Sequence, residues 1–121
     1  MRTSFQIVVA EPLPDWVRGF YTSELPPDNF SLHWLNEGSG TESLEAIGGA
    51  DAIVTGKQRI TAAMINAGGP SLKLIQVQGR APWAVDLEAA AAANVPVSFM
   101  PHRGAIAVAE HTLALALGVY R

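Results

Sequence analysis

The sequence predicts an α/β domain in which a five-stranded parallel sheet carries helices on both faces. Two observations support this fold class. Short apolar runs alternate with segments of helical character, and glycine and proline separate them along the chain. A helical segment follows each of the first four runs, which is the pattern of βαβ crossovers. Among such folds we expect the flavodoxin-like strand order 2-1-3-4-5.

The expected strands are the apolar runs. FQIVVA is rich in β-branched residues and is closed by EPLP, which indicates a buried strand. FSLHWL alternates apolar and polar side chains and suits an edge strand. AIVTG, LKLIQV and VPVSFM complete the set. We therefore expect strands over residues 5–10, 30–35, 52–56, 72–77 and 95–100.

The first two helices carry weak signals. Trp16 and Phe20 lie on neighbouring faces of a short helix expected near residues 15–22. Ser39 and Glu42 have the spacing of a capping box, which predicts a helix that runs from there to the double glycine at 48–49.

The next two helices carry clearer caps. Thr61 is expected to cap the helix of AAMINA, which glycine and proline end at 68–70. Asp86 is expected to cap the alanine-rich segment LEAAAAA, and Asn94 suits the left-handed residue at its exit.

The final segment, IAVAEHTLALALGVYR, behaves differently. Its apolar residues cover most of a helical circumference, so one small sheet cannot bury them all. Something else must cover the helix of residues 106–121.

Composition limits the function classes. Of 121 residues, 49% are hydrophobic and 16% are charged, which suffices for a buried core. The net charge of −3 has no basic block, so we expect neither nucleic acid nor membrane as a partner. The absence of cysteine excludes disulfides and fits a cytoplasmic location.

Four patterns could carry chemistry. The QGRAPW turn follows a strand, and its backbone amides could hold a small anion beside Arg80, although an ordinary strand-to-helix turn reads the same way. PHRG places His102 and Arg103 after a strand, where they could touch an anion or lie in solvent. Glu110 and His111 are adjacent on a helix and cannot face each other, which favours a structural role.

The fourth pattern, a metal site, is not expected. The three histidines lack ligand spacing and have no paired carboxylates near them. AEPLPD after the first strand has no glycine, serine or lysine to cradle a phosphate, which argues against flavin binding. AIVTG does not end in the aspartate of a response-regulator receiver.

Residues 51–121 resemble the D-isomer-specific 2-hydroxyacid dehydrogenases. Three segments carry the resemblance in order: ADAIVTGKQRITAAMI, LKLIQVQGRAPWAVDLEAAAAANVPVSFMP and AVAEHTLALALGVYR. The resemblance implies a flavodoxin-like substrate domain over residues 1–101. It also implies that residues 102–121 form a linker and an interdomain helix leading to an NAD(P)-binding domain. The enzyme would form a homodimer through the helix of residues 106–121.

The resemblance also implies a substrate site. Its carboxylate-binding turn matches Gly79, Arg80 and Ala81, where alanine replaces the second glycine of the family pattern and is expected to alter the turn. Trp83 replaces a smaller residue there and is expected to narrow the cleft. Four further residues are expected to contact substrate or cofactor. His102, Arg103 and Gly104 would lie at the substrate, with Gly104 in place of a family asparagine, and Val108 would lie near the nicotinamide.

Two functions follow as expectations. In the first, the chain is the truncated N-terminal part of an NAD- or NADP-dependent oxidoreductase acting on D-2-hydroxy or 2-oxo acids. The catalytic residues would lie outside the chain, which would be inactive alone and would not hold the cofactor tightly. In the second, it is a non-catalytic carboxylate-binding or dimerisation module derived from that fold. A flavodoxin-like domain of unrelated function is a third reading.

Overall fold

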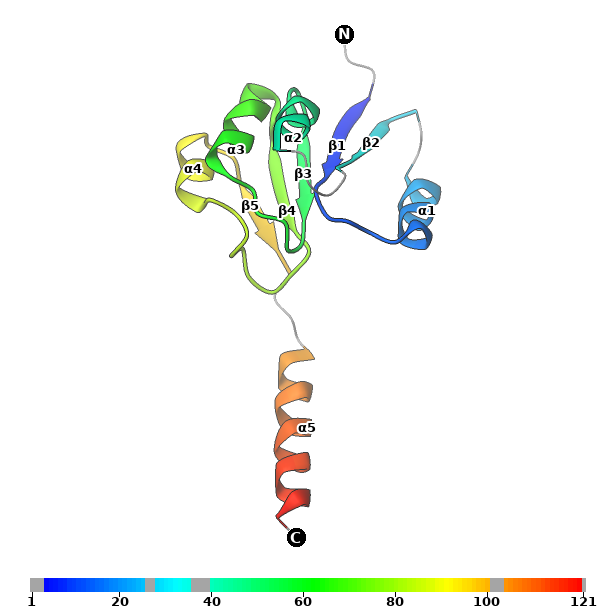
Figure 1. Cartoon of the computed structure of the whole chain (residues 1–121), viewed down its shortest axis with the longest axis vertical. Helices are drawn as coiled ribbons and strands as arrows, with labels where there is room; N and C mark the ends of the chain where they lie inside the picture. The colour runs from blue at the N-terminus through cyan, green and yellow to red at the C-terminus, as the bar shows by residue number, and fades with distance from the viewer. Residues whose placement is uncertain (1–3, 26–27, 36–39, 101–103, 121) are drawn as a thin grey trace.

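A computed structural model of the chain describes residues 4–25, 28–35, 40–100 and 104–120 (Figure 1). Its centre is a five-stranded parallel sheet with the order β2-β1-β3-β4-β5, which confirms the predicted fold and order. The strands are β1 Phe5–Val9, β2 Phe30–Trp34, β3 Ala52–Thr55, β4 Leu74–Val77 and β5 Val97–Phe99.

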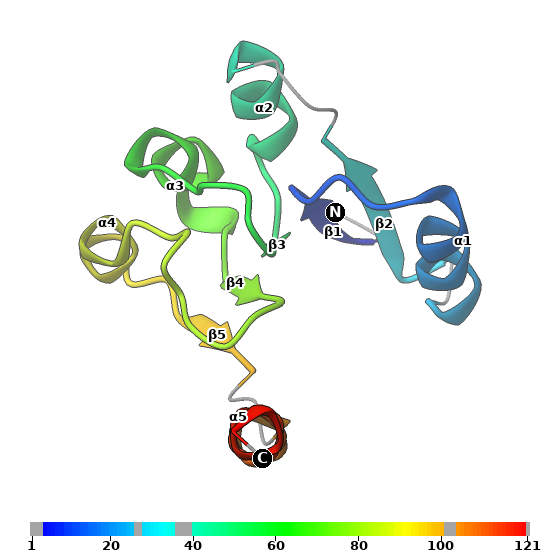
Figure 2. The ribbon, with the colours of Figure 1, turned by 60° about the horizontal axis from the view of Figure 1, so that its bottom comes forward.

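Helices connect the strands and lie on both sides of the sheet. Figure 2 shows α2, α3 and α4 on one side and α1 on the other, beside β2. The helices are α1 Asp15–Glu24, α2 Gly40–Ile47, α3 Ala62–Gly68, α4 Leu87–Ala92 and α5 Gly104–Val119, with a single 3₁₀ turn, η1 Gly69–Ser71, after α3.

The predicted caps of α3 and α4 are confirmed. The side-chain oxygens of Thr61 and Asp86 accept hydrogen bonds from the backbone N–H groups of Met64 and Ala89, at 3.4 and 3.0 Å. Asn94 has a φ of 57°, the left-handed conformation expected after α4. Ser39, in the expected capping box of α2, lies outside the described residues.

The main core lies between the sheet and the layer of α2, α3 and α4. Val8, Ile53 and Ile75 stand side by side in the strand register and are completely buried. Ile47 of α2 and Ile65 of α3 close over them, with α3 packed between α2 and α4. Continuous apolar runs are expected of strands buried in this way.

The predicted strands are one to three residues too long, and two of the differences share a cause. Leu72 and Val95 are buried, yet neither lies in a strand. Leu72 ends η1, and the N–H of Val95 donates to the carbonyl of Ala90 at 2.9 Å, which closes the end of α4. Both positions favour apolar residues because they are buried, although neither pairs with a neighbouring strand. The apolar run in the sequence is therefore longer than the paired strand.

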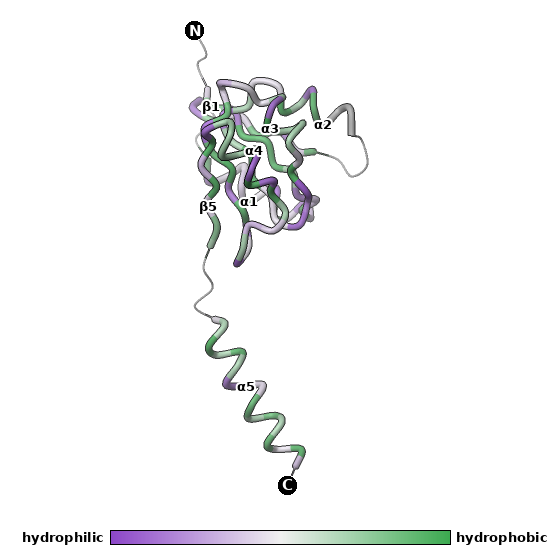
Figure 3. Tube along the Cα trace, turned by 90° about the vertical axis from the view of Figure 1, so that its left-hand side faces the viewer, coloured by the Kyte–Doolittle hydropathy of each residue, from purple (hydrophilic) through white to green (hydrophobic). Residues whose placement is uncertain are grey.

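Two helices contribute nothing to this core. No residue of α1 is buried, and α1 extends two residues past its predicted end. The helix α5 stands clear of the sheet, with apolar residues along its whole length (Figure 3). Its large apolar side chains are 59% to 85% exposed. The expectation that the sheet cannot cover this helix is confirmed.

Candidate functional site

The carboxyl ends of the central strands meet at one edge of the sheet, where ligands bind in folds of this kind. Backbone hydrogen bonds join the segments that leave this edge. The N–H of Ala10 donates to Val54 at 2.8 Å, and the N–H of Gln78 donates to Thr55 at 2.6 Å. The N–H of Met100 donates to Gly79 at 2.9 Å. The loop after β4 is therefore held on both sides, by the ends of β3 and β5.

The turn of Gly79, Arg80 and Ala81 begins this loop. Within the described part of the chain, no backbone or side-chain acceptor takes a hydrogen bond from the N–H groups of these three residues. Gly79 and Ala81 are half-buried, while Arg80 is exposed. Three successive amides without acceptors, one of them from an arginine, are donors of the kind that can hold a small anion such as a carboxylate.

The backbone conformation of the turn suits alanine at position 81. Neither Gly79 nor Ala81 has a positive φ, so Ala81 is not strained here, and whether the turn differs from that of the family stays a prediction. A β-carbon on Gly79 would meet only a methyl group of Val77, at 3.7 Å, an ordinary contact. Neither backbone conformation nor space within the described chain requires glycine at position 79. Its open face remains free for close approach by another group.

The remaining site residues are placed only in part. Trp83 is 90% exposed, and whether it narrows the cleft stays a prediction. Gly104 begins α5, and Val108 on the same helix is 64% exposed. His102 and Arg103 lie outside the described residues, so their relation to the 79–81 turn stays a prediction. Glu110 and His111 are both exposed on α5.

The sequence did not reveal the role of Glu11. Its carboxylate accepts hydrogen bonds from the backbone N–H groups of Gly56, Lys57 and Gln58, in the turn after β3. The AEPLPD motif indicated only that phosphate-binding residues are absent after the first strand. An acid directly after a central strand was the available signal, but its partners lie 45 to 47 positions away.

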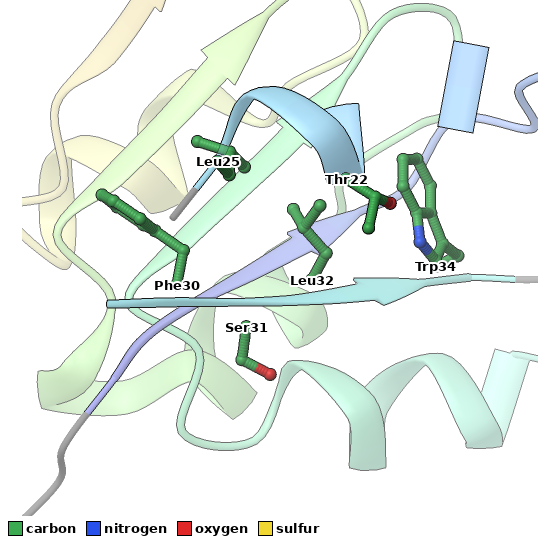
Figure 4. A pocket seen from close by; sticks show the side chains of 6 residues that line it. All are labelled: Thr22, Leu25, Phe30, Ser31, Leu32 and Trp34. Atoms are coloured by element: carbon green, nitrogen blue, oxygen red, sulfur yellow. The ribbon is translucent and has the colours of Figure 1, made fainter. Parts of the chain in front are cut away.

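A cavity of about 370 Å³ lies elsewhere, between α1 and the edge strand β2 (Figure 4). Phe30, Leu32 and Trp34 of β2 face α1, and the ring of Trp34 contacts Tyr21 edge-on and the guanidinium of Arg18. The cavity is open and has no converging charged groups. It reflects the loose packing of α1 and does not belong to the amide turn.

The strand order, the helices on both sides and the open amide turn define a flavodoxin-like domain with free backbone donors at one edge of the sheet. The model of the D-isomer specific 2-hydroxyacid dehydrogenase catalytic domain matches residues 7–116. The chain therefore belongs to the D-isomer-specific 2-hydroxyacid dehydrogenase family, a family of oxidoreductases, and the resemblance seen in the sequence is confirmed.

Individual relatives agree with this assignment. The D-3-phosphoglycerate dehydrogenase of Mycobacterium leprae (strain TN) is 32% identical over 94 residues, which cover 78% of this chain and 18% of the relative. The solved 2-hydroxyacid dehydrogenase of Ketogulonicigenium vulgare Y25 matches with a TM-score of 0.74 and 26% identity, over 96% of this chain and 36% of that one.

The NAD+-bound 3-phosphoglycerate dehydrogenase of Entamoeba histolytica shares the fold, with a TM-score of 0.71 and 21% identity over 79% of this chain and 32% of that one. The chain thus spans less than a fifth of the curated relative and about a third of the solved ones. The described helices include none long and apolar enough to cross a bilayer.

Proposed function

We propose that this chain is the substrate domain of an NAD- or NADP-dependent oxidoreductase that interconverts D-2-hydroxy acids and 2-oxo acids. The observation that carries the proposal is the turn of Gly79, Arg80 and Ala81, with three successive N–H groups that the described chain leaves without acceptors. Every 2-hydroxy and 2-oxo acid presents a carboxylate, and a carboxylate accepts such amides well.

The chemistry divides between binding and transfer. In this proposal the 79–81 turn holds the carboxylate, and Arg80 adds a positive charge from the exposed side of the loop. His102, Arg103 and Gly104 complete the substrate side. The nicotinamide cofactor supplies the hydride chemistry, and Val108 packs near its ring. Because AEPLPD after β1 offers no phosphate cradle, we place the dinucleotide on residues beyond this sheet.

The helix α5 supports a proposed division of the chain. We assign residues 1–101 to the substrate domain and residues 102–121 to a linker and helix that pack against a cofactor domain and a second copy. Leu113, Leu117 and Val119 of α5 are each more than half exposed. An apolar helix in this state requires a covering surface in the functional assembly.

The experiment is a titration of the ¹⁵N-labelled chain with pyruvate and D-lactate, followed by backbone NMR. We expect saturable shifts at the amides of 79–81. The variant Gly79→Ala keeps the fold but adds a methyl group to the open face of the turn, so it should bind at least about tenfold more weakly, a loss of about 1.4 kcal/mol. Gly19→Ala on α1 is the matched control, because a β-carbon there meets nothing within 4 Å.

The outcomes separate the two candidate functions. Carboxylate shifts at 79–81 that Gly79→Ala weakens and Gly19→Ala leaves unchanged support the substrate domain. Self-association through α5 without any carboxylate shift at 79–81 would contradict it and favour the non-catalytic dimerisation module.

A further inference from the structure

The carboxylate of Glu11 lies in a turn made of backbone amides. Its Oε2 atom accepts hydrogen bonds from the N–H groups of Gly56, Lys57 and Gln58 at 2.9, 2.7 and 3.3 Å. Three N–H groups converging on one anionic oxygen form an anion nest, and hydrogen bonds to a charged acceptor are stronger than neutral ones. This nest is already filled by a residue of the same chain.

The nest lies where a parallel sheet of this order normally leaves a crevice. The strands β1 and β3 are neighbours. The chain leaves β1 toward α1 on one side of the sheet and leaves β3 toward α3 on the other (Figure 2). The two loops therefore diverge, and the crevice between them is the usual ligand position of such folds. Here the side chain of Glu11 crosses it.

Gly56 is fitted to this carboxylate. A β-carbon at position 56 would lie 3.0 Å from both Cδ and Oε2 of Glu11 and 3.3 Å from Oε1. The φ of Gly56 is not in the left-handed range, so its backbone does not call for glycine. A side chain at position 56 would therefore require the Glu11 carboxylate to shift.

The turn that Glu11 holds is bonded to the start of the substrate loop. The hydroxyl of Thr55, which is completely buried, donates to the carbonyl of Gln58 at 2.7 Å. The carbonyl of Thr55 accepts the N–H of Gln78 at 2.6 Å, and Gly79 follows directly. Glu11 is thus connected to the 79–81 turn through Gln58, Thr55 and Gln78.

We propose that Glu11 is a positioning residue for the substrate loop. It closes the crevice between β1 and β3 with an internal anion and fixes the 55–58 turn, and through Thr55 and Gln78 it sets the conformation of the 79–81 amides. The incoming carboxylate therefore finds one open nest, at 79–81, and not two. This inference rests on the proposed function only for its effect on substrate affinity.

The first test needs no substrate. In Glu11→Gln the side chain keeps its shape and loses its charge. We expect the NMR chemical shifts of the backbone amides to change at residues 56–58 and, beyond the nest, at residues 78–81. In Glu11→Ala the nest is vacated, and formate should produce saturable shifts at 56–58 that the wild-type chain does not show. Glu24→Gln, an exposed acid on α1, is the control. Unchanged 78–81 amides in Glu11→Gln, or a folded Glu11→Ala without a formate response at 56–58, would overturn the proposal.

The second test uses Gly56→Ala, in which the added methyl group displaces the Glu11 carboxylate while residue 11 stays a glutamate. Pyruvate affinity at 79–81 should fall by about tenfold in Gly56→Ala and in Glu11→Ala, and the double variant should be no worse than Glu11→Ala, because the added methyl group then has room. Additive losses would overturn the proposal. A wild-type chain that binds no pyruvate would refute the proposed function, while the ligand-free shifts would still decide the role of Glu11.

Discussion

Lys73 and Asp51 meet at the amino edge of the sheet, with the Lys73 Nζ atom 3.0 Å from the Asp51 Oδ1 atom. The two partners differ in their surroundings, since the Asp51 side chain is 8% exposed and that of Lys73 is 64% exposed. The other carboxylate oxygen of Asp51 accepts the backbone N–H of Gln6 at 2.9 Å. One buried acid therefore connects the start of β3 to β1 and to the residue before β4.

Asp51→Ala is expected to destabilise the fold by about 1–3 kcal/mol, because it removes a buried acceptor of the Gln6 amide. Lys73→Met should cost only about 0–1 kcal/mol, because an ion pair with an exposed partner is screened by water. Urea unfolding followed by circular dichroism measures both. Equal losses in the two variants would show that the ion pair, and not the amide bond, carries the stabilisation.

The two helix caps, at Asp86 and Thr61, are expected to stabilise the fold by different amounts. Asp86→Ala should lower the free energy of unfolding by about 1 kcal/mol, because the Ala89 amide loses its acceptor. Thr61→Ala should cost less, since its bond to Met64 is longer, at 3.4 Å. Asp86→Asn keeps a capping oxygen and serves as the control. Urea midpoints in the reverse order would contradict the capping geometry.

Two small substitutions of Asn94, the left-handed residue after α4, are expected to change the stability of the fold differently. Asn94 is exposed and has a φ of 57°. Asn94→Ala should destabilise by about 1 kcal/mol, because a β-carbon disfavours this conformation and alanine lacks the polar side chain that tolerates it. Asn94→Gly should be neutral or slightly stabilising. Thermal melts of the two variants compare them directly, and an equal drop in Tm would rule out backbone strain as the cause.

The exposed helix predicts self-association. Leu113→Glu and Leu117→Glu place charges on the apolar surface of α5 and should shift the chain toward monomer in sedimentation velocity. Ala92→Glu adds the same charge to an exposed position of α4 and should leave the oligomeric state unchanged. A wild-type chain that sediments as a monomer with α5 helical would contradict the dimer.

The sequence predicted what depends on local pattern. Apolar runs located the five strands, and Thr61, Asp86 and Asn94 marked helix ends because capping and left-handed exits are short-range effects. Strand ends were less accurate, since Leu72 and Val95 are buried without being paired.

The candidate site, too, could be predicted only where it depends on local sequence. The 79–81 turn could be proposed because it follows directly from a strand in the sequence. The nest around Glu11 could not, because its donors lie in the turn after β3, which comes close to Glu11 only when the sheet forms.

The strand order also affects how this chain is made. Of these five strands, β1 is synthesised first and is an interior one, and its neighbour β3 follows only after β2 and α2. Until β3 emerges, β1 presents a row of unpaired backbone groups beside Val8 and Val9, which are completely buried in the finished sheet. Open strand edges of this kind attract other chains. The nascent protein therefore exposes this edge of β1 until β3 has emerged and paired with it.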